Sequence, residues 1–228
     1  MILVTGSTGH LGKATIQFLL NKIPASQIAA LARDKDKAEE FTKKGIDVRV
    51  GNYNDYESLQ GATKGIDTML LISSADMDDR ITQHINVIKA ARENGVKHII
   101  YTSADVKDIN DSATGEIAET HAATSEFLRQ SGITYTLLNN NLYADVVPMF
   151  VGEKVLETGV YLPAGDGKVP FATRENMAEA AAVVLTTNGH GNKEYTIAGE
   201  TAHSFKDIAQ MLSDITGKDV PYTSPSPD

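Results

Sequence analysis

The chain has 228 residues, a length that suits one domain or one domain with a small lobe. Its 30 acidic and 21 basic residues give a net charge of -9, which argues against nucleic acid or an anionic membrane surface as a partner, because both require a basic face on the protein. Because the sequence contains no cysteine, disulfides, thiolate catalysis and cysteine metal sites are excluded.

Short apolar segments alternate with helical patterns over residues 1–140. We predict strands at 2–5, 28–32, 48–50, 68–72, 98–102 and 134–138. We predict helices from Leu11 up to Pro24, from Asp34 to Lys44, along Ile81, Ile85 and Ile88, and from Glu116 to Gln130. This alternation predicts an α/β fold of the Rossmann type, with a doubly wound parallel sheet.

After residue 140 the pattern loosens, and we predict a small C-terminal substrate lobe. Its expected elements are turns between Gly159 and Gly167, an alanine-rich helix at 175–186, a strand at 194–197, a helix with its apolar face at Phe205, Ile208, Ala209, Leu212 and Ile215, and an exposed tail at 221–228. We therefore expect an NAD(P)-binding Rossmann domain at 1–140 and a smaller mixed α/β lobe at 141–228. This lobe would return one strand, about 194–198, to the sheet.

A glycine-rich turn joins the first predicted strand to the first helix, with glycines at Gly6, Gly9 and Gly12. In a dinucleotide site, Gly6 would allow the sharp turn, Gly9 would let a pyrophosphate approach the backbone, and Gly12 would let the helix pack closely on the strand. Free amides and the positive helix end would then hold the phosphates. The predicted cofactor contacts from this turn are Gly6, Thr8, Gly9, His10, Leu11 and Gly12.

The glycine turn allows two other interpretations. Any tight strand–helix turn can use glycine, so the pattern gains its weight from its place in a β-α-β series. A P-loop requires a glycine where Ser7 stands and a hydroxyl residue where Ala14 stands, so we reject it.

The residue at the end of the second strand bears on the choice of cofactor. Sites that prefer NAD place an acidic residue there for the ribose 2′-hydroxyl. Here Arg33 occupies that place, about 20 residues after the glycine turn, and a guanidinium attracts a 2′-phosphate. Arg33 therefore favours NADP (NADPH) over NAD. The alternative is that Arg33 is a solvated loop arginine without a role in cofactor binding.

Several short motifs carry a resemblance to a known family. They are the glycine turn, Ala32-Arg33, Gly51 to Asp55 after the third strand, Leu71 to Ser74 after the fourth, and Tyr101-Thr102-Ser103. Together they resemble atypical short-chain dehydrogenases of the NmrA-like type, among them bacterial NAD(P)H:quinone oxidoreductases. Such proteins usually continue further at the C-terminus, which leaves open that the substrate lobe is truncated.

The resemblance implies roles for seven further residues. Asn52 would contact adenine, and Tyr53 would line its pocket. Ser73 and Ser74 would flank the nicotinamide ribose. Asn140 and Asn141 would lie beside the nicotinamide, with Asn141 and Tyr143 facing the substrate.

The sequence lacks the proton-donating pair of typical short-chain dehydrogenases. None of its eight tyrosines has a lysine four residues later, and His121 stands near the expected place. Reduction of an unactivated ketone needs such a donor for the alkoxide, whereas reduction of a quinone yields a phenolate stabilised by aromatisation, for which positioning can suffice. His121 is a weak candidate for a proton donor, and the alternative is a partly exposed helix histidine.

We therefore expect an NADPH-dependent oxidoreductase that transfers hydride to a quinone-like acceptor. The alternative is a non-catalytic NmrA-like regulator that binds NADP(H) to sense redox state, and a third option is a reductase for another conjugated acceptor, such as a dye or an enone. The six histidines show no spacing typical of a zinc site, so no metal is expected. With no signal-peptide pattern and no apolar run of ~20 residues, we expect a cytoplasmic protein without a membrane partner, and a homodimer stays open.

Overall fold

The computed structural model describes residues 1–76, 78–105 and 115–226, which form two compact units. The first unit contains Met1–Asn140 and Glu175–Ile197, and the second contains Asn141–Arg174 and Ala198–Asp228. The helix that the sequence pattern assigned to the lobe at 175–186 thus belongs to the first unit, together with the strand that follows it.

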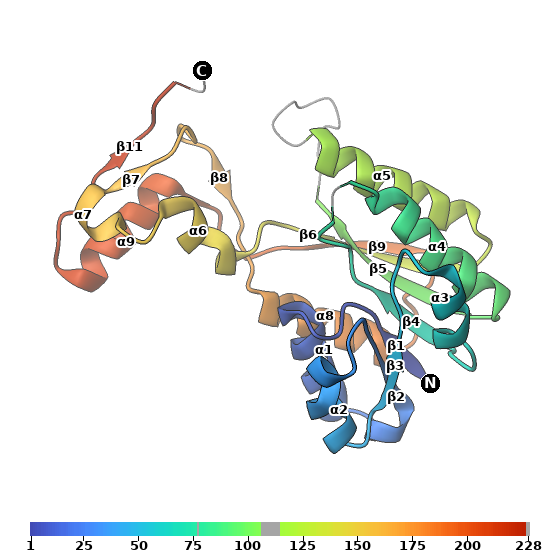
Figure 1. Cartoon of the computed structure of the whole chain (residues 1–228). Coiled ribbons are helices and arrows are strands. Elements are labelled where there is room, and N and C mark those ends of the chain that lie inside the picture. The colour runs from blue at the N-terminus through green and yellow to red at the C-terminus, as the bar shows by residue number, and fades with distance from the viewer. Residues whose placement is uncertain (77, 106–114, 227–228) are drawn as a thin grey trace. The chain divides into compact units, whose positions relative to one another are not determined.

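A seven-stranded sheet forms the centre of the first unit (Figure 1). In spatial order its strands are β3 (Asp47–Val50), β2 (Ile28–Ala32), β1 (Ile2–Val4), β4 (Thr68–Leu71), β5 (His98–Ala104), β6 (Thr134–Asn140) and β9 (Lys193–Ile197). Every neighbouring pair runs parallel. This order is that of a Rossmann-type sheet, so the predicted fold class is confirmed.

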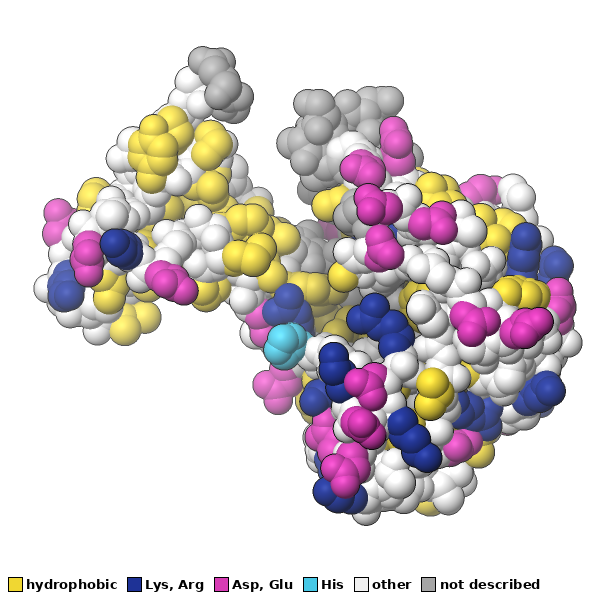
Figure 2. Space-filling view, in the orientation of Figure 1, with side chains coloured by type: hydrophobic (Ala, Val, Ile, Leu, Met, Phe, Trp, Pro, Cys, Tyr) yellow, Lys and Arg dark blue, Asp and Glu magenta, His cyan; other side chains and the backbone are white. Residues whose placement is uncertain are grey.

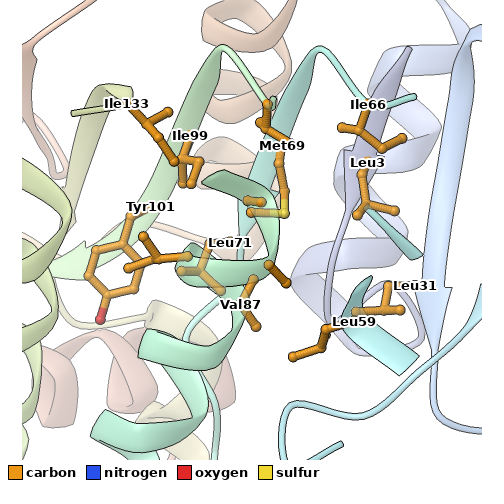
Figure 3. Close-up of a cluster of buried hydrophobic side chains, with 14 of the residues drawn as sticks. Leu3, Leu31, Leu59, Ile66, Met69, Leu71, Val87, Ile99, Tyr101 and Ile133 are labelled. Atoms are coloured by element: carbon orange, nitrogen blue, oxygen red, sulfur yellow. The ribbon is translucent and has the colours of Figure 1, made fainter. Parts of the chain in front are cut away.

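Helices cover both faces of this sheet. One face packs against α1 (His10–Leu20), α2 (Glu39–Lys43) and α8 (Arg174–Thr186), and the other against α3 (Tyr56–Ala62), α4 (Arg80–Glu93) and α5 (Gly115–Gln130). Short 3-10 turns lie at Ala25–Gln27 (η1) and Asp36–Ala38 (η2). Successive strand residues serve opposite cores: Leu3 packs with Leu59 and Val87, as Figure 3 shows, whereas Val4 belongs to the other core.

The buried face of α4 differs from the predicted one. Ile88 is buried as predicted, but Ile81 and Ile85 are only partly buried, whereas Gln83 and His84 are buried. The polar residues Gln83 and His84 therefore lie on the core-facing side of this helix, which the spacing of its isoleucines did not predict. Such buried polar groups need hydrogen-bond partners, and these lie at the candidate site.

Two further elements of the first unit depart from the sequence pattern. The helix expected at 34–44 is a 3-10 turn followed by the five-residue helix α2. The pattern did not predict α3, whose N-terminus is capped by the Asp55 side chain accepting from the Ser58 amide at 3.1 Å.

The second unit is small and mixed. Its elements are η3 (Ala144–Val146), α6 (Val147–Val151), α7 (Val155–Thr158), β7 (Val160–Tyr161), β8 (Lys168–Val169), β10 (His203–Ser204), α9 (Phe205–Thr216) and β11 (Tyr222–Thr223). Its core contains Val160, Phe205 and Ala209. Two expectations were wrong: Ile215 is 80% exposed, and the tail is not simply an exposed end, because β11 pairs with β7 and Tyr222 packs against the core of this unit.

Candidate functional site

The glycine turn leads from β1 into α1 at the carboxyl end of the sheet. Gly6 has a φ of +55°, a conformation that L side chains rarely adopt. The Ser7 hydroxyl donates to the Leu31 carbonyl oxygen at 2.8 Å and so ties the turn to β2. No side chain of the described residues caps α1 at Gly9, and its first turn carries no acidic residue. The amides and the positive end of α1 are thus left for an anion.

Gly9 and Gly12 differ in the space that the protein leaves for a side chain. A Cβ at Gly12 would lie 2.7 Å from the Ser7 Cα and 2.9 Å from the Gly6 carbonyl carbon, so this position has no room for a side chain. At Gly9 the nearest protein atom to a Cβ is the Gly6 oxygen at 3.4 Å, and the backbone (φ -80°, ψ 169°) suits any residue. The protein itself therefore does not require glycine at position 9, whereas close approach of a ligand would.

A cavity of about 210 Å³ opens beside this turn. Five of the predicted site residues line it: Gly6, Arg33, Asn52, Tyr53 and Ser74. The remaining lining residues are Leu31, Gly51, Asn54, Ile72, Ala75, Asp76 and Gln83. The segments that follow β1, β2, β3 and β4 thus meet at one place, because parallel strands bring their carboxyl ends to the same edge.

Within this cavity, Arg33 is exposed and forms no ion pair with a described residue. The Tyr53 hydroxyl lies 2.5 Å from Thr5 Oγ1 and 2.9 Å from the Ile72 carbonyl oxygen, and these two acceptors share its single proton. Burial raises the pKa of Tyr53 well above its ordinary value, so the phenol stays protonated. Asn52 Oδ1 accepts from the Asn54 amide at 3.1 Å, which leaves the Asn52 NH₂ group as a donor toward a base.

The two predicted serines lie in the loop after β4. The Ser73 amide donates to Thr102 Oγ1 at 2.9 Å, and the Ser73 hydroxyl accepts from the Arg80 guanidinium, whose Nε lies at 3.1 Å. The Ser74 amide donates to His84 Nε2 at 2.8 Å. Side chains of α4 therefore hold the loop that forms one wall of the cavity.

His121 is buried rather than partly exposed, so the alternative that made it a partly exposed histidine was wrong. Its Nε2 lies 3.0 Å from an Arg80 nitrogen, and its Nδ1 lies 2.9 Å from the Tyr101 hydroxyl. Because arginine only donates, Nε2 accepts and Nδ1 carries the proton. Burial, with the Arg80 charge, lowers the pKa of His121 to about 3, and burial raises the pKa of Tyr101 to about 12.

The residues predicted beside the nicotinamide fall in different units. Asn140 ends β6 in the first unit, and its buried Oδ1 has no hydrogen-bond partner among the described residues. Such an orphaned acceptor suits a ligand that brings an N–H donor, as a carboxamide does. In the second unit, Asn141 Oδ1 accepts from the Leu142 amide at 2.8 Å, and the Arg174 guanidinium lies 4.8 Å from the Tyr143 ring centroid.

Sequence reasoning missed the polar side chains that support the cavity. Gln83 donates to the Asp76 carboxylate at 2.7 Å, and both residues line the cavity. Arg80, Gln83 and His84 are spaced so that they share one face of α4. The spacing of these three polar residues could have indicated this face, but the spacing of the isoleucines led to the prediction of a different buried face.

The surface of the first unit is mixed in charge. Figure 2 shows acidic and basic side chains interleaved over the part of the first unit that carries α1 and α2. Within residues 1–76, 78–105 and 115–226, no cluster of three or more acidic or histidine residues is suited to a metal ion. Over the same residues, no helix has the length and apolarity that crossing a membrane requires.

The sheet order, the glycine turn and the cavity at the carboxyl ends of the strands define a Rossmann-type α/β protein. A sequence model of the NmrA-like family matches residues 1–227, and the chain belongs to this family.

Comparison with individual proteins agrees with this assignment. The chain is 42% identical to quinone oxidoreductase 2 of Escherichia coli (strain K12) over 223 residues, which are 97% of this chain and 77% of that protein. A crystal structure of triphenylmethane reductase from Citrobacter sp. complexed with NADP(H) has a TM-score of 0.90 and 41% identity, with 99% of this chain and 79% of that one covered. An NADPH-dependent quinone oxidoreductase from Escherichia coli complexed with NADPH also has a TM-score of 0.90, at 40% identity and the same coverage.

Proposed function

We propose that this protein is an NADPH-dependent oxidoreductase that transfers hydride to a quinone-like acceptor. The single observation that carries cofactor binding is the cavity beside the glycine turn, where Gly6, Arg33 and Asn52 come together. The relatives at about 40% identity are named as reductases, and two of them are described with NADPH or NADP(H).

The residues of the first unit fit a dinucleotide phosphate. The open N-terminus of α1 would hold the pyrophosphate, since Gly9 has neither a side chain nor a structural need for glycine. Arg33 would pair with the 2′-phosphate, because its guanidinium is exposed at the cavity. Asn52 and Tyr53 would receive the adenine, and the orphaned Asn140 oxygen would accept from the carboxamide. When bound, NADPH supplies the hydride.

The chain's own residues favour an acceptor that needs no strong acid. His121 is neutral at pH 7, and both of its ring nitrogens already have protein partners, so we assign it a supporting role and not that of a proton donor. Tyr101 is fully buried with a raised pKa. A quinone takes hydride to become a hydroquinone anion, which is protonated from water, and catalysis then rests on holding donor and acceptor together.

Steady-state oxidation of NADPH, followed at 340 nm, tests this proposal. We expect oxidation to depend on added 1,4-benzoquinone or a naphthoquinone and to be absent with cyclohexanone, whose alkoxide would need a proton donor. A triphenylmethane dye is the matched second acceptor, given the relative named for that activity. Tight NADPH binding without turnover on any of these acceptors would refute the enzyme and favour a redox-sensing regulator.

A further inference from the structure

A buried histidine stands behind the cofactor cavity. His84 lies on α4 and Thr124 on α5, and the side chains of both are fully buried. His84 Nε2 lies 2.8 Å from the Ser74 amide nitrogen, and His84 Nδ1 lies 2.9 Å from Thr124 Oγ1. The histidine therefore connects α5 to the loop that carries Ser74 and Asp76 into the cavity.

The Ser74 amide at one end of this series of hydrogen bonds, and the Thr120 carbonyl oxygen at the other, fix which group donates in each bond. A backbone amide only donates, so His84 Nε2 accepts from Ser74 and the ring proton lies on Nδ1. Nδ1 then donates to Thr124 Oγ1, whose own hydroxyl donates to the Thr120 carbonyl oxygen at 2.8 Å. Burial, with the nearby charge of Arg80, lowers the pKa of His84 to about 3, which agrees with a neutral ring.

The neighbouring residue, Ser73, is also held by a side chain of α4. Arg80 donates to the Ser73 hydroxyl and to His121 Nε2, and His121 lies on α5. His84 thus holds Ser74 directly, and Arg80, which His121 contacts in turn, holds Ser73. The other contacts of the two histidines come from α5 and β5. The loop itself carries few apolar anchors, since Ser73 to Asp76 are half-buried or exposed.

We propose that His84 is a positioning residue for the cofactor, and that Thr124 holds it in the tautomer that can accept from Ser74. This inference rests on the proposed function, because the wall formed by Ser74 and Asp76 matters only if the cavity takes NADPH. Without the Thr124 hydroxyl, the Nδ1 proton loses its acceptor in a buried place. The ring then changes tautomer or turns, and the Ser74 amide is released.

Thr124→Val tests the proposal, because valine keeps the shape of threonine and removes the hydroxyl. Thr124→Ser keeps the hydroxyl and should behave as the wild type. Thr120→Val is the matched control on the same helix, since the Thr120 hydroxyl donates only to the nearby Ile117 carbonyl oxygen at 2.9 Å. Two quantities are measured: hydrogen exchange of the Ser74 amide without cofactor, and the NADPH dissociation constant by calorimetry.

For Thr124→Val we expect Ser74 exchange at least about tenfold faster and an NADPH Kd about tenfold higher. Thr124→Ser and Thr120→Val should stay within about twofold of the wild type in both measurements. A wild-type Kd in Thr124→Val overturns the positioning role, whether or not exchange is faster. A wild-type chain that binds no NADP(H) overturns the proposed function and the positioning role with it.

A second pair of variants decides the question if Thr124→Val does not fold. His84→Gln keeps one acceptor and one donor, whereas His84→Leu is apolar and has neither. We expect the glutamine variant to bind NADPH at least about fivefold more tightly than the leucine variant. Equal affinities of the two variants would overturn the proposal.

Discussion

Gly9 offers a direct test of which glycines serve the cofactor and which serve the fold. In Gly9→Ala, the new methyl group meets no protein atom closer than 3.4 Å, and the backbone conformation suits alanine. Reduced freedom of the unfolded chain adds about 0.4–1 kcal/mol of stability, and the poorer N-cap removes about as much. The free energy of unfolding should therefore stay within about 1 kcal/mol of the wild type.

The same methyl group should weaken NADPH binding strongly. It would stand where the phosphate has to approach the amides of the first turn of α1. Loss of one charge-assisted hydrogen bond from these amides costs about 1.5–3 kcal/mol, which raises the Kd between about tenfold and a hundredfold. Calorimetric titration with NADPH measures this change, and urea unfolding measures the stability.

Gly12→Ala is the contrasting variant. Its methyl group would lie 2.7 Å from the Ser7 Cα and against the Gly6 backbone, none of which can yield as a flexible side chain could. We expect a loss of about 1–3 kcal/mol or more in unfolding free energy, with or without cofactor. Unchanged NADPH affinity in Gly9→Ala, in protein of wild-type stability, would refute the assignment of this turn to the pyrophosphate.

Three further predictions follow from the first unit. In Arg33→Ala, the Kd for NADPH should rise about tenfold or more while that for NADH stays unchanged, because only the 2′-phosphate is lost as a partner; equal losses for both cofactors in calorimetry would argue against this contact. In Tyr53→Phe, the Ile72 carbonyl oxygen loses its donor, so the unfolding free energy in urea should fall by about 1 kcal/mol or more, and an unchanged value would contradict the role of this hydroxyl. His84 and His121 have pKa values lowered from 6.5 to about 3, so the unfolded chain takes up protons first as the pH falls. The unfolding free energy should then decrease below pH 6.5 by up to about 1.4 kcal/mol per pH unit for each of these two histidines, and NMR signals assigned to His84 or His121 that titrate near 6.5 in the folded protein would contradict this result.

Local patterns were sufficient for the sheet and for the turn that enters α1. The run at 28–32 is apolar because parallel strands are buried on both faces, and β2 is indeed buried along its whole length. The glycine turn was recognisable because its residues are contiguous and its neighbours are a strand and a helix. Arg33 was placed by its position after the second strand, and Asn52 and Ser74 by the resemblance to the NmrA-like family. All three follow strands of the parallel sheet, which brings such positions to one edge.

Other features depend on contacts between residues that are distant in the sequence. Helical spacing marked the isoleucines of α4, but the buried side of that helix carries His84, because Thr124 of α5 and the Ser74 amide supply its hydrogen bonds. The tail strand β11 exists because β7 offers it a partner 62 residues away in register.

What the sequence by itself determined is the series of strands in the central sheet and the turn at Gly6 to Gly12, since local periodicity and glycine spacing encode both. Only the tertiary structure decided that His84 and His121 are buried and neutral, and that Asn140 presents an unpaired oxygen. The physical reason is that burial and hydrogen-bond partners come from elements that meet only when the sheet is assembled, and the charge state of a histidine follows from both.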